Sequence, residues 1–156
     1  MSLPSSQAAD NRRAVLRVTT LEILKALRSL AQMHEGDMFA LLIFTSIWSA
    51  NGEHLIGDER YTGLRTIGPD STSKPITDDQ LQRSLGVPRD ILERYLEMFI
   101  EMGLVERVAC GLVVPGAVFT SAEMMGGANE AYDRIVGLVS ALRSAGFALG
   151  EETPKD

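Results

Sequence analysis

The sequence has little of what metal sites and disulfides are built from. Its 156 residues include one cysteine, Cys110, and two histidines, His34 and His54, which are far apart in the chain. A single cysteine forms no disulfide within the chain, and the Cys and His spacing of a zinc site is missing. We therefore expect no metal, no cofactor and a cytoplasmic location.

Motifs of catalysis and of membrane insertion are also missing. The pair Gly126-Gly127 is not followed by the Lys-Ser/Thr of a phosphate-binding loop. Asp78-Asp79 falls at a predicted helix start, so we do not interpret it as a catalytic carboxylate pair. The longest apolar run, residues 38–48, is too short to span a membrane, and residues 1–6 lack the apolar core of a signal peptide. We predict a protein that is not an enzyme, with an enzyme of unrecognised motif as a weaker alternative.

Positive charge is scarce and unevenly placed. The chain has 15 Lys and Arg against 21 Asp and Glu, a formal net charge of −6, which argues against a generally basic nucleic-acid-binding surface. Residues 1–30 carry five basic and two acidic residues, whereas residues 76–115 carry four basic and seven acidic ones. The start of the chain is therefore basic, and the region with the most informative motif is acidic.

Apolar residues at three- and four-residue spacing predict long helices at both ends of the chain, over residues 11–35 and 121–146. A second helix over residues 38–50 is apolar on nearly every side, which predicts that it lies at the centre of the fold. Asp37 and Ser121 are suited to cap helices, and Gly126-Gly127 is expected to bend or delay the last one.

Residues 51–75 are rich in glycine and proline. We interpret them as an insertion with a short strand near residues 61–67.

Residues 76–114 predict two short helices followed by two strands. Thr77 and Gln80 match a capping box. Gly86 suits the left-handed turn after the first helix, and Pro88 suits the start of the second. Gly103 ends the second helix. The strands, at residues 104–109 and 112–115, are joined tightly at Cys110-Gly111, and the second helix has an apolar face made of Ile91, Leu92, Tyr95, Leu96, Phe99 and Ile100.

This pattern resembles the winged helix-turn-helix of bacterial transcriptional regulators, through residues 80–89, 94–96 and 102–107. The order of the other elements resembles the MarR (multiple antibiotic resistance regulator) group, in which long terminal helices flank the reading head and build a dimer. The resemblance implies a mainly α fold, a winged helix-turn-helix with long N- and C-terminal helices and a small β-hairpin wing. We predict a flexible arm at 1–10, a single winged-helix domain at 11–148 and a flexible tail at 149–156. Within the domain we place the helix-turn-helix at 77–102, the wing at 104–115 and a C-terminal dimerisation helix at 121–146.

In such regulators the second helix lies in the major groove of DNA. The resemblance implies that Arg89 and Arg94 contact guanine or phosphate, and that Lys74, Arg83 and Arg107 hold the phosphate backbone. The alternative is that the arginines are ordinary surface charges, since Arg89–Glu93 and Arg94–Glu97 are spaced to pair along a helix. The complete predicted DNA-binding set is Lys74, Arg83, Arg89, Asp90, Glu93, Arg94 and Arg107.

Several residues depart from the family pattern. Glu93 and Glu97 stand where small polar or basic residues are usual, and Pro88 replaces a serine or threonine. The wing tip, residues 109–111, carries no basic side chain. The segment Asn11-Arg12-Arg13, together with Arg17, is a candidate for DNA contact, although a solvated helix start is the simpler interpretation.

We predict a homodimeric DNA-binding transcriptional regulator, with apolar stripes on residues 14–33 and 124–149 as the dimer interface. A small-molecule effector is a further candidate partner. Its pocket would be lined by Met98, Met102, Met124 and Met125, although such methionines are more often part of the core. The alternative function is a winged-helix module that binds protein rather than DNA.

Overall fold

The computed structural model describes residues 10–149, and it confirms a mainly helical fold with a small antiparallel hairpin. The predicted arm and tail lie outside the described residues, apart from Asp10 and Leu149. The helices are α1 (Arg12–Ala31), α2 (Met38–Gly52), α3 (Asp78–Leu85), α4 (Arg89–Glu101) and α5 (Ala122–Ser144), and the strands are β1 (Glu106–Val108) and β2 (Gly111–Val113).

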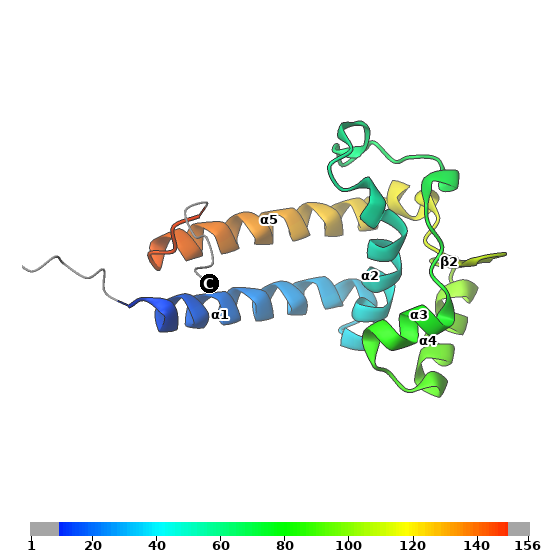
Figure 1. Ribbon diagram of the computed structural model, residues 1–156, viewed down its shortest axis with the longest axis horizontal. Helices are drawn as coiled ribbons and strands as arrows, with labels where there is room; N and C mark the ends of the chain where they lie inside the picture. Colours follow the sequence, from blue (N-terminus) through cyan, green and yellow to red (C-terminus); the bar gives the residue numbers. More distant parts are fainter. Residues whose placement is uncertain (1–9, 150–156) are drawn as a thin grey trace, which may run out of the picture.

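Helices α1 and α5 lie side by side and project from the rest of the molecule (Figure 1). They run antiparallel, because the Asn11 side chain at the start of α1 donates to the Gly146 carbonyl oxygen just past the end of α5, at 2.8 Å. Nearer the other end of the pair, the Ser29 hydroxyl is hydrogen-bonded to the Glu130 carboxylate. We call this pair of helices the stalk, and residues 38–52 together with 76–114 the head.

The core lies in the head, where α2, α3, α4 and the hairpin meet. Helix α2 buries Ile43, Phe44 and Ile47, whereas Phe39 and Trp48 are each 53% exposed. Helix α2 contacts α1, α3, α4 and β2, as expected of a helix at the centre of the fold, although Phe39 and Trp48 leave part of its apolar surface exposed. The largest fully buried side chains are Phe99, Ile43, Ile47, Leu81, Leu92, Leu96, Leu112 and Val105.

Asn51, at the end of α2, is the one buried polar residue within the described residues. Its side-chain NH₂ donates to the carbonyl oxygens of Lys74 (2.8 Å) and Leu112 (3.0 Å), and its side-chain oxygen accepts from the Val114 N–H at 2.9 Å. Every polar atom of the side chain is thus paired, as burial requires. Asn51 joins α2 to the hairpin and to the segment that leads into α3.

The predicted caps of α2, α3 and α5 are confirmed, whereas α1 ends at Ala31 and not near residue 35. Thr77 and Gln80 form both bonds of the capping box, and Asp37 and Ser121 accept from backbone N–H groups at the starts of α2 and α5. Gly86 adopts φ +66°, a left-handed conformation that glycine reaches without strain.

Two predictions of local structure are wrong. Residues 61–67 form no strand; the segment between α2 and α3 contains short 3₁₀ turns instead, since only Ile76 reaches a pairing partner, Leu112. Gly126-Gly127 does not delay α5, which starts at Ala122. A Cβ at Gly127 would meet the end of the flexible Met33 side chain, which would have to move.

Candidate nucleic-acid interface

Helix α4 is amphipathic and turns its polar face to solvent. Leu92, Leu96 and Phe99 point into the head core, at 0–1% exposure. The exposed polar positions are Asp90, Glu93, Arg94, Glu97 and Glu101. Ile100, which the sequence placed on the buried face, is 37% exposed. Of the predicted DNA-binding set, the structure therefore places Asp90, Glu93 and Arg94 on one solvent-facing surface.

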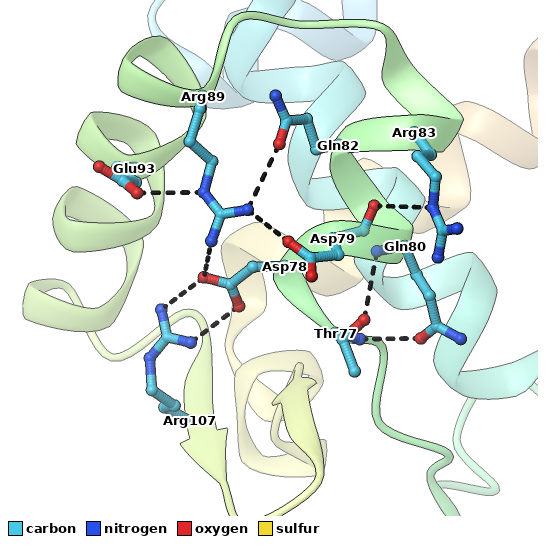
Figure 2. A network of polar contacts seen from close by, with 9 residues as sticks. All are labelled: Thr77, Asp78, Asp79, Gln80, Gln82, Arg83, Arg89, Glu93 and Arg107. Carbon is cyan, nitrogen blue, oxygen red and sulfur yellow. Dashed lines mark hydrogen bonds and ion pairs between the residues drawn. The ribbon is translucent and has the colours of Figure 1, made fainter.

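Arg89, the first residue of α4, is surrounded by acceptors from its own chain (Figure 2). Its Nε donates to Glu93 at 3.0 Å, and its Nη1 donates to Asp79 at 2.6 Å and to the Gln82 side-chain oxygen at 3.3 Å. Its Nη2 lies 3.8 Å from Asp78. The spacing of Arg89 and Glu93 predicted one of these pairs, whereas the pairs with α3 arise from the packing of the two helices.

Arg107, on β1, pairs with Asp78 at the start of α3. Its Nη1 and Nη2 donate to the two carboxylate oxygens at 2.8 and 3.2 Å. These hydrogen bonds, together with the positive charges of Arg107 and Arg89, hold the pKa of the Asp78 carboxyl below its usual value. The bidentate pair fixes the hairpin against α3, at 29 residues' separation in sequence.

The ion pairs of Figure 2 join Arg89 and Arg107 to the carboxylates of Asp78, Asp79 and Glu93. The third arginine drawn, Arg83, bonds only to the Asp79 backbone. These three carboxylates neutralise the charges of Arg89 and Arg107 and carry one more negative charge than the two arginines carry positive charges. An anionic ligand that approaches Arg89 or Arg107 must compete with these carboxylates.

The other predicted cations are more accessible. Lys74 and Arg94 are exposed and have no ion-pair partner among residues 10–149. The predicted pair of Arg94 with Glu97 is therefore absent there. Arg83 is exposed, and its Nε donates only to the Asp79 backbone oxygen, at 3.3 Å. Arg83 and Arg94 thus carry the unpaired positive charge of the head, and Lys74 adds an exposed charge just before it in the chain.

The hairpin is short and has an uncharged tip. Ala109 and Cys110 form its two-residue turn, between the paired Val108 and Gly111. Gly111 lies so close to Ile76 that a Cβ there would clash with the Ile76 carbonyl. This close approach lets Ile76 and Leu112 exchange backbone hydrogen bonds of 3.1 and 2.8 Å, a third pairing segment that the sequence pattern did not indicate.

A second polar contact links the start of α2 to α4. The Tyr95 hydroxyl donates to Asp37 Oδ2 at 2.7 Å, which lowers the pKa of Asp37 and raises that of Tyr95. His34 lies beside Phe44 and Phe99, at ring-centroid distances of 5.5 and 6.0 Å. Burial lowers the pKa of His34, against the opposing effect of Asp37. Sequence reasoning found Asp37 and Tyr95 separately, as a cap and an apolar-face residue, but not their contact.

The methionines proposed to line an effector pocket are only partly buried. Met98 and Met102 are 37% and 63% exposed, whereas Met124 packs against the core. A shallow hollow of about 440 Å³ lies instead along α5, lined in part by Tyr132, Val136 and Val139.

Within residues 10–149 no cluster of three or more His, Cys, Asp or Glu side chains is arranged to hold a metal ion, and none of the helices there combines the length and apolar character of a membrane span. Comparison of the chain with protein-family models, curated proteins and solved structures finds no match.

Proposed function

We propose that the protein is a homodimeric DNA-binding transcriptional regulator with a winged helix-turn-helix head. The observation that carries the proposal is the way α4 is held: it follows α3 after a short turn, buries Leu92, Leu96 and Phe99, leaves its polar face exposed, and leads into the hairpin. A helix held in this way is able to enter a major groove while its neighbours contact phosphates. The pairing of Ile76 with Leu112 supports the wing interpretation, because it extends the hairpin into the head.

The stalk supports the dimer. None of the 23 residues of α5 is buried, and Ala31 is the only buried residue of α1. Two long helices that bury so little against each other leave apolar side chains without a partner, and a second copy would cover them. The exposed apolar residues of the stalk are Leu16, Leu21, Ile23, Leu24, Tyr132, Ile135 and Val136.

Lys74, Arg83 and Arg94 are the proposed phosphate and base contacts, because they are exposed and do not have to leave a carboxylate first. We expect Arg94→Ala to weaken binding to a duplex by roughly five- to tenfold at low salt and to reduce the salt slope by about two, one for each protomer of the dimer. Fluorescence anisotropy over a salt series measures both. Arg65→Ala is the matched control, since it removes an equal charge from the segment between α2 and α3. Equal losses for the two variants, or no binding by the wild type at low salt, would contradict the proposal.

The dimer has its own test. Ile135 on α5 is 57% exposed, and Ile56, outside the stalk, is 83% exposed. Ile135→Glu places a charge on the proposed interface and is expected to produce monomers in sedimentation velocity, whereas Ile56→Glu leaves the dimer intact. A wild-type protein that sediments as a monomer at micromolar concentration contradicts the dimer.

The second candidate is a winged-helix module that binds protein. The observation that favours it is the charge balance of the head, where carboxylates outnumber the arginines that they neutralise in Figure 2. Failure of the dimer to bind mixed duplexes at low salt, with binding of a basic protein partner instead, would favour this candidate.

A further inference from the structure

Arg89 has two properties that the proposed function leaves unexplained. It begins α4, where the N-terminal residues of a recognition helix approach bases. Yet its charge is held by acceptors on its own chain, which approach the guanidinium from α3 and α4 (Figure 2). The two nearest carboxylates, Asp79 and Glu93, are exposed, at 78% and 55% of their side-chain surface, so both lie where DNA would approach.

The geometry leaves Arg89 no complete edge for DNA. A guanidinium binds guanine or phosphate best through two neighbouring N–H groups on one edge. Glu93 accepts from Nε on one edge, and Asp79 and Gln82 both accept from Nη1 on the other. A base or phosphate must therefore displace at least one of these acceptors before it forms a bidentate contact.

We propose that Asp79 and Glu93 act as a carboxylate clamp that withholds Arg89 from DNA and so weakens the sequence-independent affinity of the head. This inference rests on the proposed function. In the wild type, a phosphate that reaches Arg89 gains one charge-assisted contact, while Arg89 loses another of the same kind. The displaced carboxylate also stays close to the phosphate and repels it. Arg89 then adds little to binding unless the clamp is removed.

The clamp is open to mutation without loss of the fold. Its members are exposed, and exposed ion pairs contribute little to stability. The test variant Asp79→Asn/Glu93→Gln keeps the shapes of both side chains and removes two negative charges. The control Asp90→Asn/Glu97→Gln removes the same charge from exposed positions of α4 that have no ion-pair partner in the described part of the chain. Arg89→Ala is then added to the wild type and to the clamp variant.

Binding is measured by anisotropy with a mixed-sequence duplex of about 30 base pairs, long enough for a dimer that spans one helical turn. The clamp variant is expected to bind roughly tenfold more tightly than the wild type, with a salt slope larger by about two, one for each protomer, and the control roughly two- to threefold more tightly. Arg89→Ala is expected to change wild-type affinity by less than about twofold and to abolish the gain of the clamp variant.

Two outcomes overturn the clamp while the proposed function stands: equal gains for clamp variant and control, or a loss in wild-type Arg89→Ala as large as that of Arg94→Ala. Absence of binding by every variant at low salt overturns the proposed function and the clamp's effect on DNA together.

A second readout needs no DNA. The Arg89 Nε–H proton, bonded to Glu93, is expected to exchange with water more slowly in the wild type than in the clamp variant when followed by NMR. Equal exchange in the two proteins shows that the clamp does not hold Arg89 in solution and overturns the inference.

Discussion

The head buries many of its large apolar side chains, whereas the stalk leaves its own at least partly exposed. In the head, a few short elements bury Phe99, Leu92 and Leu112 completely. In the stalk, two helices of 20 and 23 residues contribute one buried residue, Ala31. Hydrogen bonds from Asn11 and Ser29 align the stalk helices without enclosing their apolar faces. The difference shows that length and amphipathicity do not build a core by themselves; elements must converge from several directions.

The largest expected effect is a difference in the free energy of unfolding between two aromatic substitutions, one in the head and one in the stalk. Phe99 is 0% exposed and Tyr132 is 67% exposed. Phe99→Ala should lower the free energy of unfolding by about 3–5 kcal/mol, because it removes contacts and leaves a cavity. Tyr132→Ala should cost less, and its cost should depend on protein concentration if the stalk is a dimer interface. Urea denaturation at two protein concentrations measures both, and a concentration-independent loss of similar size at Tyr132 would contradict the distinction.

A smaller effect is expected at Asn51, which secures the head. Asn51→Ala should lower the free energy of unfolding by roughly 2–3 kcal/mol, because it leaves the carbonyl oxygens of Lys74 and Leu112 and the N–H of Val114 without this partner. Asn11→Ala, which removes a hydrogen bond at the exposed end of the stalk, is the control and should cost less than about 0.5 kcal/mol. Equal losses would show that the head is no more tightly constrained than the stalk.

The smallest effect is a pH dependence at the junction of stalk and head. Burial lowers the pKa of His34 below its ordinary value of 6.5. The unfolded chain then binds more protons than the folded one in the window below pH 6.5. Stability is fully present above pH 6.5 and falls as the pH drops through the lowered pKa. Chemical denaturation across this window should show the loss in the wild type and in His54→Gln, and His34→Gln should reduce it. A dependence unchanged by His34→Gln assigns the effect to other groups.

Local patterns in the sequence predicted much of the fold. The Thr77 capping box, the Gly86 turn, and the caps at Asp37 and Ser121 are all found where expected. Each depends on residues within about four positions of one another, so the sequence contains the whole interaction. The predicted strand at residues 61–67 failed for the complementary reason: a strand requires a partner, and a single segment does not reveal whether one is near.

For the candidate site, the sequence determined the residue types and which face of α4 carries them. It indicated Arg89, Arg94 and Glu93 on the exposed side of an amphipathic helix because helical periodicity is a local property. The tertiary structure alone decided which of these charges are available. Packing of α3 against α4 brings Asp79 to Arg89, and packing of the hairpin against α3 brings Asp78 to Arg107. These partners are 10 and 29 residues apart, so their pairing follows from the assembly of the head, and that assembly leaves Arg94 as the arginine of α4 that faces solvent without an ion-pair partner among the described residues.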